Sequence, residues 1–247
     1  MSSLLVLSTH PVHAEEPLRI AVASNFAGTM ERLAELHEHQ HGVSSRISSG
    51  SSGKHYAQIR QGAPFDVFFS ADDVRTAELA EEGHGIADTR QVYARGRLVL
   101  WSRDPDRIPE DGAAFLASAD DQRLAMANPR LAPYGAAAEA VMDSLNLERP
   151  PGRVVVGQNI GKTFNFVTTG NAAIGFVALS QVRDWERENG AGSRWLPDAD
   201  RYPPVIQEAI VLSDSDRTDA ARELLAWMRE DPDARAVIEE DGYGLPR

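Results

Sequence analysis

The sequence ISSGSSGKHYAQIRQGAPFDVFFSAD, residues 47–72, alternates between the patterns of strands and helices. A weak strand pattern at residues 43–47 precedes it, and residues 54–61 have the composition of a short helix. A second strand pattern follows at 65–70 and leads into a helical pattern at 71–83. Because strand–helix alternation is typical of a parallel sheet with helices on both faces, we predict an α/β fold.

The alternation continues on both sides of this stretch. Strand patterns lie at residues 18–23, 98–101, 124–127, 154–156, 174–179 and 205–212, and helical patterns at 26–40, 136–147, 159–169, 181–188, 218–229 and 234–240. The 247 residues suffice for two lobes of about 100 residues each, but no long linker separates them. We therefore expect a discontinuous first lobe, residues 15–97 and 205–247, and a second lobe, residues 98–204, with crossings near 97–101 and 202–205.

The composition limits the classes of partner. The apolar fraction of 42% and the charged fraction of 25% are ordinary for a globular protein, and no run approaches the roughly 20 apolar residues of a membrane span. The net charge of −12 disfavours nucleic acid and anionic membrane surfaces. The absence of cysteine excludes disulfides, thiolate catalysis and cysteine-bound metals. We expect a monomer with no nucleic-acid partner and no direct membrane insertion.

The first 14 residues have features of an export signal. Leu4-Leu5-Val6-Leu7 is apolar, and Val12-His13-Ala14 before Glu15 has the small Ala14 where signal peptidase would cut. The apolar core is short, and no Lys or Arg precedes it. We interpret residues 1–14 as the remainder of a signal peptide whose start lies further upstream, which predicts export to the periplasm. A disordered N-terminal tail is the alternative.

Two polar segments each follow a predicted strand and open a predicted helix. They are Ala23-Ser24-Asn25-Phe26 and Ser48-Ser49-Gly50-Ser51-Ser52-Gly53. The first backbone N–H groups of a helix have no partner within the helix, so this position favours anions. Small hydroxyl and amide side chains add donors, and glycine lets the backbone approach a ligand. The segments predict two walls of a pocket for a small anion. Taken alone, a helix cap by Ser24 or Asn25 and a flexible serine–glycine loop explain them as well.

Two further segments offer donors of the same kind. Tyr134, in Ala132-Pro133-Tyr134-Gly135, can offer its hydroxyl or its backbone N–H to a ligand, or it can simply pack at a turn. Ile160, in Asn159-Ile160-Gly161-Lys162, can offer a backbone N–H at another helix start. Lys54 and Lys162 each lie two residues beyond a proposed contact and would add positive charge if they face the site, but most lysines are solvated surface groups.

Other kinds of site have less support. The sequence lacks the Gly-Lys-Ser/Thr phosphate loop, the G-x-G-x-x-G dinucleotide pattern and the Gly-x-Ser-x-Gly pattern of hydrolases. His37 and His41 share a helix face, but no third metal ligand lies near them, and histidines also suit the C-terminal end of a helix. Asp66, Asp72 and Asp73 could form a catalytic or cation site, but helix capping is the simpler interpretation. We expect no enzyme activity.

Four segments together resemble the periplasmic molybdate-binding proteins of ABC importers. They are ASNFAGTMERLA, ISSGSSGKHYAQIRQGAPFDVFFSAD, NPRLAPYG and AAIGFVAL, and the resemblance extends over residues 18–245. It implies a two-lobed type II periplasmic binding-protein fold, in which each lobe is a mixed sheet flanked by helices and the ligand cleft lies between the lobes. It also implies molybdate or tungstate as the ligand, no further cofactor, and delivery of the ligand to a membrane ABC permease.

The resemblance also assigns the ligand contacts. They are Ser24, Asn25 and Ser52 on the first lobe and Tyr134 and Ile160 on the second. Elsewhere in the family a serine takes the place of Asn25, and a tyrosine near residues 174–179 completes the site. Ala178 stands at that point in this chain, so Tyr134 would substitute from the other side.

Neutral donors at helix starts can saturate the four oxygens of a tetrahedral dianion. Selectivity against sulfate would then come from cavity size, because molybdate has the longer metal–oxygen bonds. Two alternatives remain. One is a binding protein of the same fold for sulfate or phosphate, and the other is an α/β hydrolase that uses Ser52.

Overall fold

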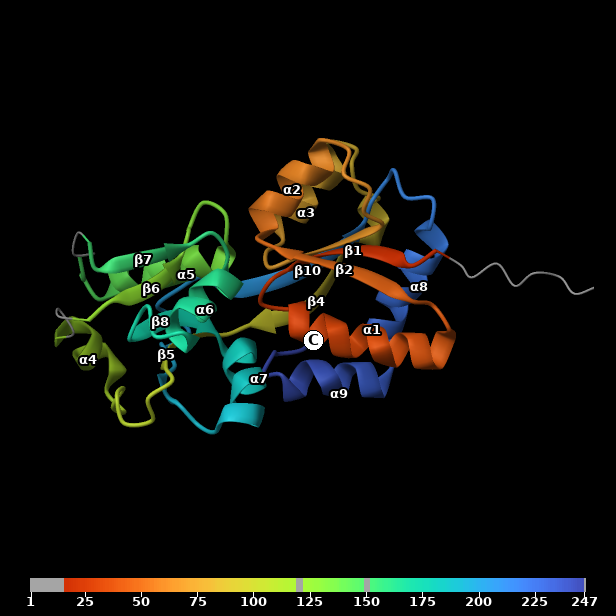
Figure 1. Ribbon diagram of the computed structural model, residues 1–247. Helices are drawn as coiled ribbons and strands as arrows, with labels where there is room; N and C mark the ends of the chain where they lie inside the picture. Colours follow the sequence, from red (N-terminus) through yellow and green to blue (C-terminus); the bar gives the residue numbers. More distant parts are fainter. Residues whose placement is uncertain (1–15, 119–121, 149–151, 247) are drawn as a thin grey trace, which may run out of the picture.

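The computed structural model describes residues 16–118, 122–148 and 152–246 (Figure 1). Its strands form two five-stranded sheets, one in each half of the molecule. The first sheet has the order β2-β1-β3-β10-β4 and the second the order β7-β6-β8-β5-β9. The strands are β1 (Leu18–Ala23), β2 (Ser45–Gly50), β3 (Val67–Ser70), β4 (Gln91–Gly96), β5 (Leu98–Ser102), β6 (Leu124–Ala127), β7 (Val154–Gly157), β8 (Ile174–Ala178), β9 (Ser193–Trp195) and β10 (Val205–Val211).

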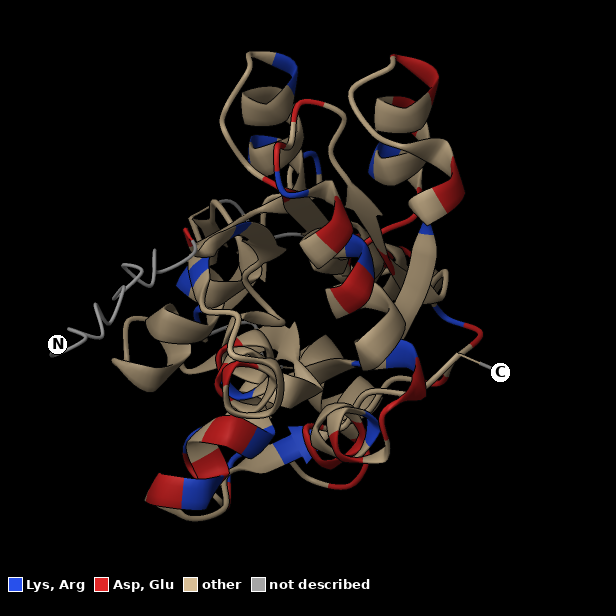
Figure 2. Ribbon diagram, turned by 90° about the vertical axis from the view of Figure 1, so that its right-hand side faces the viewer, with Lys and Arg blue, Asp and Glu red and all other residues tan. Residues whose placement is uncertain are grey.

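The helices lie over the faces of these sheets (Figure 1). They are α1 (Ala27–His41), α2 (Ser52–Arg60), α3 (Val74–Glu81), α4 (Gly112–Ser118), α5 (Pro133–Ser144), α6 (Ile160–Thr168), α7 (Leu179–Asn189), α8 (Thr218–Glu230) and α9 (Pro232–Glu240), with a 3-10 turn at Ala87–Thr89. Within the described ranges, no helix combines the length and apolar character needed to cross a bilayer. Acidic and basic segments are mixed along the outer helices, and the view in Figure 2 shows no continuous basic face.

Each sheet is mixed, as the resemblance implies. In the first sheet β1 pairs in parallel with β2 and β3, and β10 pairs antiparallel with β3 and β4. In the second sheet β6 pairs in parallel with β7 and β8, and β5 pairs antiparallel with β8 and β9. The strand–helix alternation correctly predicts the parallel pairs. The antiparallel pairs all involve β10 in the first sheet or β5 in the second.

Helices can cover both faces of the first sheet because β1 is apolar on both sides. Ile20 packs with Phe26 and Met30 on one face. Ala21 packs with Ile59 and Leu79 on the other face. The second sheet is enclosed in the same way, with one apolar cluster on each face. The carboxyl ends of β1, β2, β6 and β7 are thereby held at fixed positions, and a helix follows each of them.

Among the boundaries that differ from the sequence predictions, three bear on the predicted site. Phe26, not Ser24 or Asn25, occupies the N-cap of α1, and no side chain caps that helix, so the capping interpretation is wrong. Residues 48–50 extend β2 and are not part of a flexible loop, because they pair with β1. Helix α5 begins at Pro133, three residues earlier than predicted, which places Tyr134 in its first turn.

Two strands were not predicted. Strand β4, QVYARG, contains an arginine and a glycine, and it owes its place to pairing with β10. Strand β9, SRW, has three residues and pairs only along the end of β5. Neither has enough apolar alternation to stand out in the sequence. The predicted signal peptide, residues 1–14, lies outside the described residues.

His37 and His41 form an aromatic cluster with Trp227, in keeping with their place in the last turns of α1. The two imidazole rings stack with centroids 4.7 Å apart, and the His37 ring meets Trp227 edge-on at 4.9 Å. Over the described part of the chain, no group of three or more His, Cys, Asp or Glu is arranged to hold a metal ion. The geometry therefore gives the metal interpretation no support.

We expect acid to destabilise the fold through His37. Burial lowers the pKa of His37 below its ordinary value of 6.5, and the charge of His41 lowers it further. The unfolded chain therefore binds a proton more readily than the native protein, so the stability contributed by neutral His37 is complete above pH 6.5 and is lost as the pH falls below it. Urea unfolding at pH 7.5 and 5.5 should show that the free energy of unfolding falls more for the wild type than for His37→Phe as the pH is lowered. The control His39→Gln, at an exposed position, should lose as much as the wild type. An equal loss in wild type and His37→Phe would contradict this assignment.

Candidate functional site

Four helix starts define the candidate site. Helices α1 and α2 follow β1 and β2 in the first half, and α5 and α6 follow β6 and β7 in the second half. Since β1 pairs in parallel with β2 and β6 pairs in parallel with β7, each pair of helices starts at the same edge of its sheet. Ligands of α/β sheets bind at this edge, where helix N-termini carry partial positive charge.

Backbone hydrogen bonds join the two halves at these helix starts. The N–H of Gly161 in α6 donates to Ser24 Oγ at 3.1 Å. The N–H of Gly53 in α2 donates to the carbonyl oxygen of Leu131 at 3.0 Å. Ser24 and Ser52 from the first half therefore lie close to the starts of α5 and α6. The structure brings together the segments that the sequence singled out separately.

Helices α2 and α6 begin with the same sequence of hydrogen bonds. In each, the cap side chain accepts from the third N–H: Ser51 Oγ from Lys54 at 3.2 Å, and Asn159 Oδ1 from Lys162 at 2.7 Å. The second N–H, from Gly53 or Gly161, crosses to the other half. The first N–H groups, those of Ser52 and Ile160, have no acceptor in the described part of the chain. These two groups are available to a ligand.

The hydroxyls of Ser24 and Ser52 are free to donate. Ser24 Oγ already accepts from Gly161, and Ser52 Oγ accepts from the N–H of Ala71 at 2.9 Å. A hydroxyl has one hydrogen and two lone pairs, so an oxygen that accepts one bond can still donate another. Ser52 is almost fully buried, which shields such a bond from water.

Tyr134 has a backbone N–H that is available to a ligand, while its buried hydroxyl lies against Gly96 of β4 and Gln207 of β10. Its hydroxyl accepts from Gln207 Nε2 at 3.3 Å and lies so close to Gly96 that a Cβ there would be 2.1 Å away. Burial raises the pKa of Tyr134 well above its ordinary value, so the phenol stays neutral. Pro133, at the first position of α5, has no N–H, which makes Tyr134 the first donor of that helix. Among the described residues, its N–H has no acceptor.

Asn25 lies beside Ser24 and is buried. Its backbone N–H has no acceptor among the residues that the structure describes. Its side chain donates through Nδ2 to Gln207 Oε1 at 2.7 Å and to the hydroxyl of Tyr243 at 3.1 Å. Hydrogen bonds thus link the segments of the five predicted contact residues across the two halves, and the available groups of these residues are hydroxyls and N–H groups.

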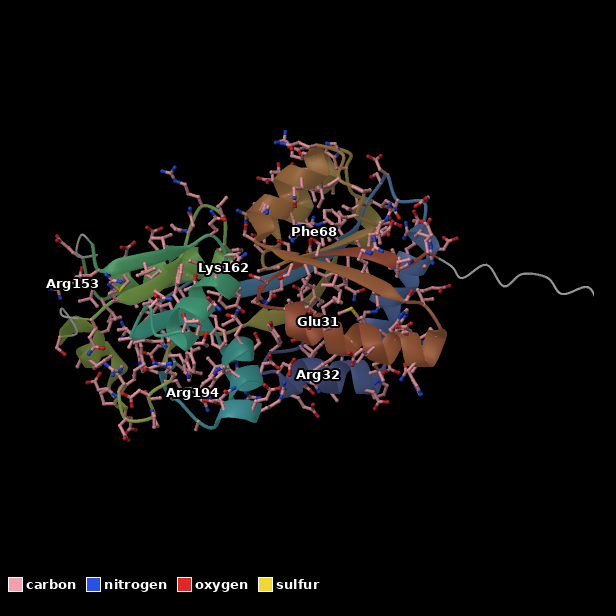
Figure 3. All side chains as sticks on the ribbon, viewed as in Figure 1. Glu31, Arg32, Phe68, Arg153, Lys162 and Arg194 are labelled. Atoms are coloured by element: carbon pink, nitrogen blue, oxygen red, sulfur yellow. The ribbon has the colours of Figure 1, made fainter. Side chains whose placement is uncertain are left out.

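The carboxylates near β3 have structural roles. Asp66 is fully buried and accepts from the guanidinium of Arg19 at 2.7 Å and from Ser215 at 2.8 Å. Asp72 accepts from the backbone N–H of Arg75 at 3.0 Å, as expected of a cap for α3. Asp73 occupies the N-cap of α3 without a side-chain hydrogen bond. Lys54 and Lys162 are exposed, and Lys162 lies on the part of α6 nearest the first half (Figure 3).

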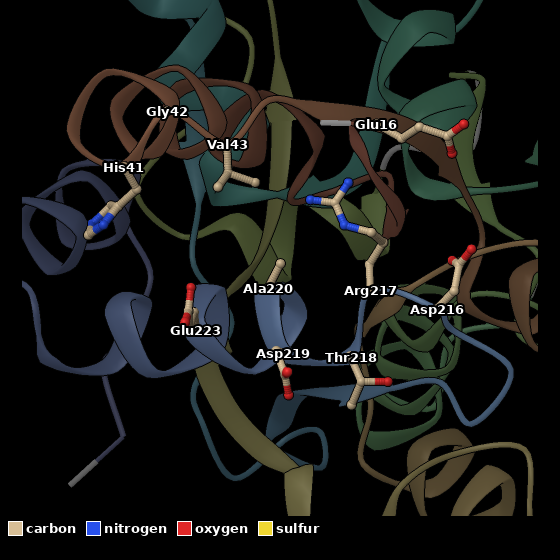
Figure 4. Close-up of a pocket in the computed structure, with 10 residues that line it drawn as sticks. All are labelled: Glu16, His41, Gly42, Val43, Asp216, Arg217, Thr218, Asp219, Ala220 and Glu223. Atoms are coloured by element: carbon tan, nitrogen blue, oxygen red, sulfur yellow. The ribbon is translucent and has the colours of Figure 1, made fainter. Parts of the chain in front are cut away.

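A large cavity elsewhere is a poor place for an anion. A cavity of about 950 Å³ lies between the end of α1 and the start of α8 (Figure 4). Carboxylates of Glu16, Asp216, Asp219 and Glu223 line it together with Arg217. Four negative charges disfavour a dianion there, so size alone does not identify the site.

The predicted site segments contain Gly53 and Gly161 but do not indicate the hydrogen bonds of these glycines across the two halves, and no sequence pattern pointed to Gln207. A signal for the two glycines is present: Ser51-Ser52-Gly53-Lys54 and Asn159-Ile160-Gly161-Lys162 share a capping residue, a donor, a glycine and a lysine. No local signal marks Gln207, which reaches the site through the pairing of β10.

Comparison with known proteins places the chain in a family. Residues 18–244 match the family described as bacterial extracellular solute-binding proteins. The molybdate-binding protein ModA of Azotobacter vinelandii is 41% identical over 230 residues, which cover 92% of this chain and 90% of that protein. ModA of Rhodobacter capsulatus is 39% identical over 224 residues, covering 90% of this chain and 86% of that protein.

The fold agrees with these matches. The solved structure of the periplasmic molybdate-binding protein of Azotobacter vinelandii superposes with a TM-score of 0.88 at 37% identity, covering 93% of this chain and all (100%) of that one. The predicted two-lobed binding-protein architecture with mixed sheets is thereby confirmed. The chain belongs to the bacterial extracellular solute-binding proteins.

Proposed function

We propose that this protein captures molybdate, or tungstate, outside the cytoplasm and delivers it to a membrane ABC permease. The observation that carries the proposal is a set of donors at the starts of four helices that have no acceptor among the described residues. They are the hydroxyls of Ser24 and Ser52 and the backbone N–H groups of Asn25, Ser52, Tyr134 and Ile160. Two relatives that cover about nine tenths of the chain are molybdate-binding proteins, which are named for binding and not for catalysis.

The donor set suits a fully deprotonated tetrahedral oxyanion. Each of the six groups can give one hydrogen bond to an oxygen, and none carries a charge. Hydrogen phosphate carries a proton that needs an acceptor, which the four backbone N–H groups cannot supply; only the second lone pairs of the two serine hydroxyls could. Sulfate has the same charge as molybdate but shorter bonds to oxygen, so the size of the closed cavity would separate them.

We further propose that the two sheets belong to two lobes that close on the ligand. The first lobe would be residues 15–97 and 205–247, and the second residues 98–204. The strands of the first sheet come from residues 18–96 and 205–211, and those of the second from residues 98–195, which supports this division. Arg97 and residues 196–204 would then form the hinge. Since both lobes supply donors, the anion would hold them together.

The cellular compartment and the oligomeric state follow from the same proposal. We propose the periplasm as the compartment, with residues 1–14 as the signal segment. We propose a monomer, because one chain supplies all the donors named above. Nothing in the net charge of −12 favours nucleic acid as a further partner.

We expect molybdate and tungstate to stabilise the protein strongly against unfolding. A ligand present at about 1,000 times its Kd adds roughly 4 kcal/mol to the free energy of unfolding. The measurement is a thermal shift with molybdate, tungstate, sulfate and phosphate at equal concentration. Stabilisation by sulfate or phosphate alone would favour the other oxyanion-binding function.

A further inference from the structure

The buried side-chain amide of Gln207 connects the two halves through two of the proposed contact residues. Gln207, on β10, is completely buried. Its Oε1 lies 2.7 Å from Asn25 Nδ2 and 2.9 Å from the hydroxyl of Tyr93, and its Nε2 lies 3.3 Å from the hydroxyl of Tyr134. Asn25 and Tyr134 belong to different halves and are both proposed contacts of the anion. Gln207 is the side chain that bonds to both.

The hydrogen bonds of this cluster are incomplete in the present arrangement. Asn25 Oδ1 is buried and accepts no hydrogen bond from any described residue. Tyr93 has one hydroxyl hydrogen but faces two acceptors, Gln207 Oε1 at 2.9 Å and the carbonyl oxygen of Ser70 at 3.0 Å. Tyr134 accepts from Gln207, and its own hydrogen meets no acceptor in the described part of the chain. A buried polar group without a partner costs free energy, so a rearrangement of these side chains that gives Asn25 Oδ1 a donor is favoured.

Rotating the amides of Asn25 and Gln207 together by 180° gives a second arrangement. Gln207 Nε2 then donates to Asn25 Oδ1 and to the hydroxyl of Tyr93, and Gln207 Oε1 accepts from Tyr134. Tyr93 keeps its single hydrogen for Ser70. The rotation also breaks the bond from Asn25 Nδ2 to the hydroxyl of Tyr243, which can turn its hydrogen to Asn25 Oδ1 while Ser180 Oγ donates to the backbone carbonyl oxygen of Asn25. The groups left without a partner among the described residues are then the N–H donors of Asn25. In the second arrangement the buried group without a partner at Asn25, the residue next to Ser24, is thus a donor, Nδ2, instead of the acceptor Oδ1.

We infer that Gln207 is a positioning residue for oxyanion binding, and that the bound anion selects this second arrangement. An anion repels the bare Oδ1 of Asn25 but accepts from its Nδ2. Gln207 would hold that Nδ2 toward the ligand from one half and fix Tyr134 on the other half. The inference rests on the proposed function, since it assumes an oxyanion beside Ser24 and Asn25.

The test compares Gln207→Met with a matched control, Gln91→Met. Gln91 lies on the neighbouring strand β4 and donates to the carbonyl oxygen of Leu225, away from the site. We expect Gln207→Met to bind molybdate about 10-fold more weakly, through faster dissociation, and Gln91→Met to bind like the wild type. Calorimetry gives Kd and stopped-flow fluorescence gives the dissociation rate. If a Gln207→Met protein binds and releases molybdate as the wild type does, the inference is wrong.

A spectroscopic measurement separates positioning from a merely structural role. In ¹⁵N-labelled wild type, the side-chain NH₂ signal of Asn25, identified by its loss in Asn25→Asp, should shift when molybdate is added. In Gln207→Met the shift should be lost or reduced in protein that is still folded, although the lost hydrogen bonds of the buried amide will lower its melting temperature.

Gln207→Glu serves as a second variant if Gln207→Met does not fold. The ionised carboxylate keeps the shape but only accepts, so it holds Asn25 Nδ2 in the first arrangement. The Asn25 signal should then fail to shift with molybdate, a result that repulsion between the carboxylate and the anion alone would not produce. An unshifted Asn25 signal in molybdate-saturated wild type would overturn the inference and leave the proposed function intact. A wild type that binds no molybdate would instead overturn the proposed function.

Discussion

A protein carrying both Ser24→Ala and Ser52→Ala is expected to bind molybdate at least about 100-fold more weakly than the wild type. Each substitution removes a hydroxyl that is free to donate, and a hydrogen bond to a charged group contributes about 1.5–3 kcal/mol. Two such losses amount to roughly 3–6 kcal/mol if they add, and each 1.4 kcal/mol changes Kd about tenfold. Because we propose that both serines contact one ligand, the single variants should show how far the effects are coupled. Titration calorimetry provides the three Kd values.

The matched control is the double variant Ser48→Ala and Ser49→Ala. It removes two hydroxyls from the same polar segment, but both residues belong to β2, before the start of α2. We expect its affinity for molybdate to equal that of the wild type. The assignment of Ser24 and Ser52 is untenable if their double variant binds as tightly as this control.

Ile160→Pro is expected to weaken molybdate binding by about 10- to 100-fold while the fold is retained, because a lost hydrogen bond to a charged group costs roughly 1.5–3 kcal/mol. Proline removes the backbone N–H that we assign to the ligand. Ile160 is the first residue of α6, a position that accepts proline, and the preceding Asn159 has extended backbone angles compatible with a following proline. Pro133 already occupies the same position in α5.

Ile160→Val separates the N–H from the side chain. Ile160 is buried, so both variants lose packing, but valine keeps the donor. We expect Ile160→Val to keep nearly the wild-type affinity with a small loss of stability, about 0.5–1.5 kcal/mol. Equal affinities for the proline and valine variants would show that the N–H of Ile160 does not contact the anion.

The elements best predicted from the sequence are those fixed by their own composition. The apolar runs of β1 and β6 have the predicted bounds, 18–23 and 124–127. Strand β4 could not be predicted because its stability comes from pairing with β10, more than 100 residues further along the chain. Local patterns describe local interactions, and β4 depends on a distant one.

The candidate site likewise has features that local sequence predicted and features that depend on contacts between distant segments. The residue types at helix starts indicated an anion pocket, and the resemblance indicated which five residues would contact the ligand. The sequence could not show that the hydroxyl of Tyr134 is buried against Gln207, because Gln207 belongs to a distant strand. It also suggested Ser24 or Asn25 as a helix cap, whereas the structure uses Ser24 Oγ to accept from Gly161 across the two halves.

The most direct test is a crystal structure of the protein with molybdate, in which anomalous scattering locates the molybdenum atom. We predict one molybdenum position between the two halves, with its oxygens within hydrogen-bonding distance of Ser24 Oγ, Ser52 Oγ and the backbone nitrogens of Tyr134 and Ile160. Molybdenum bound by residues of one half alone, or in the cavity between α1 and α8, would contradict the account.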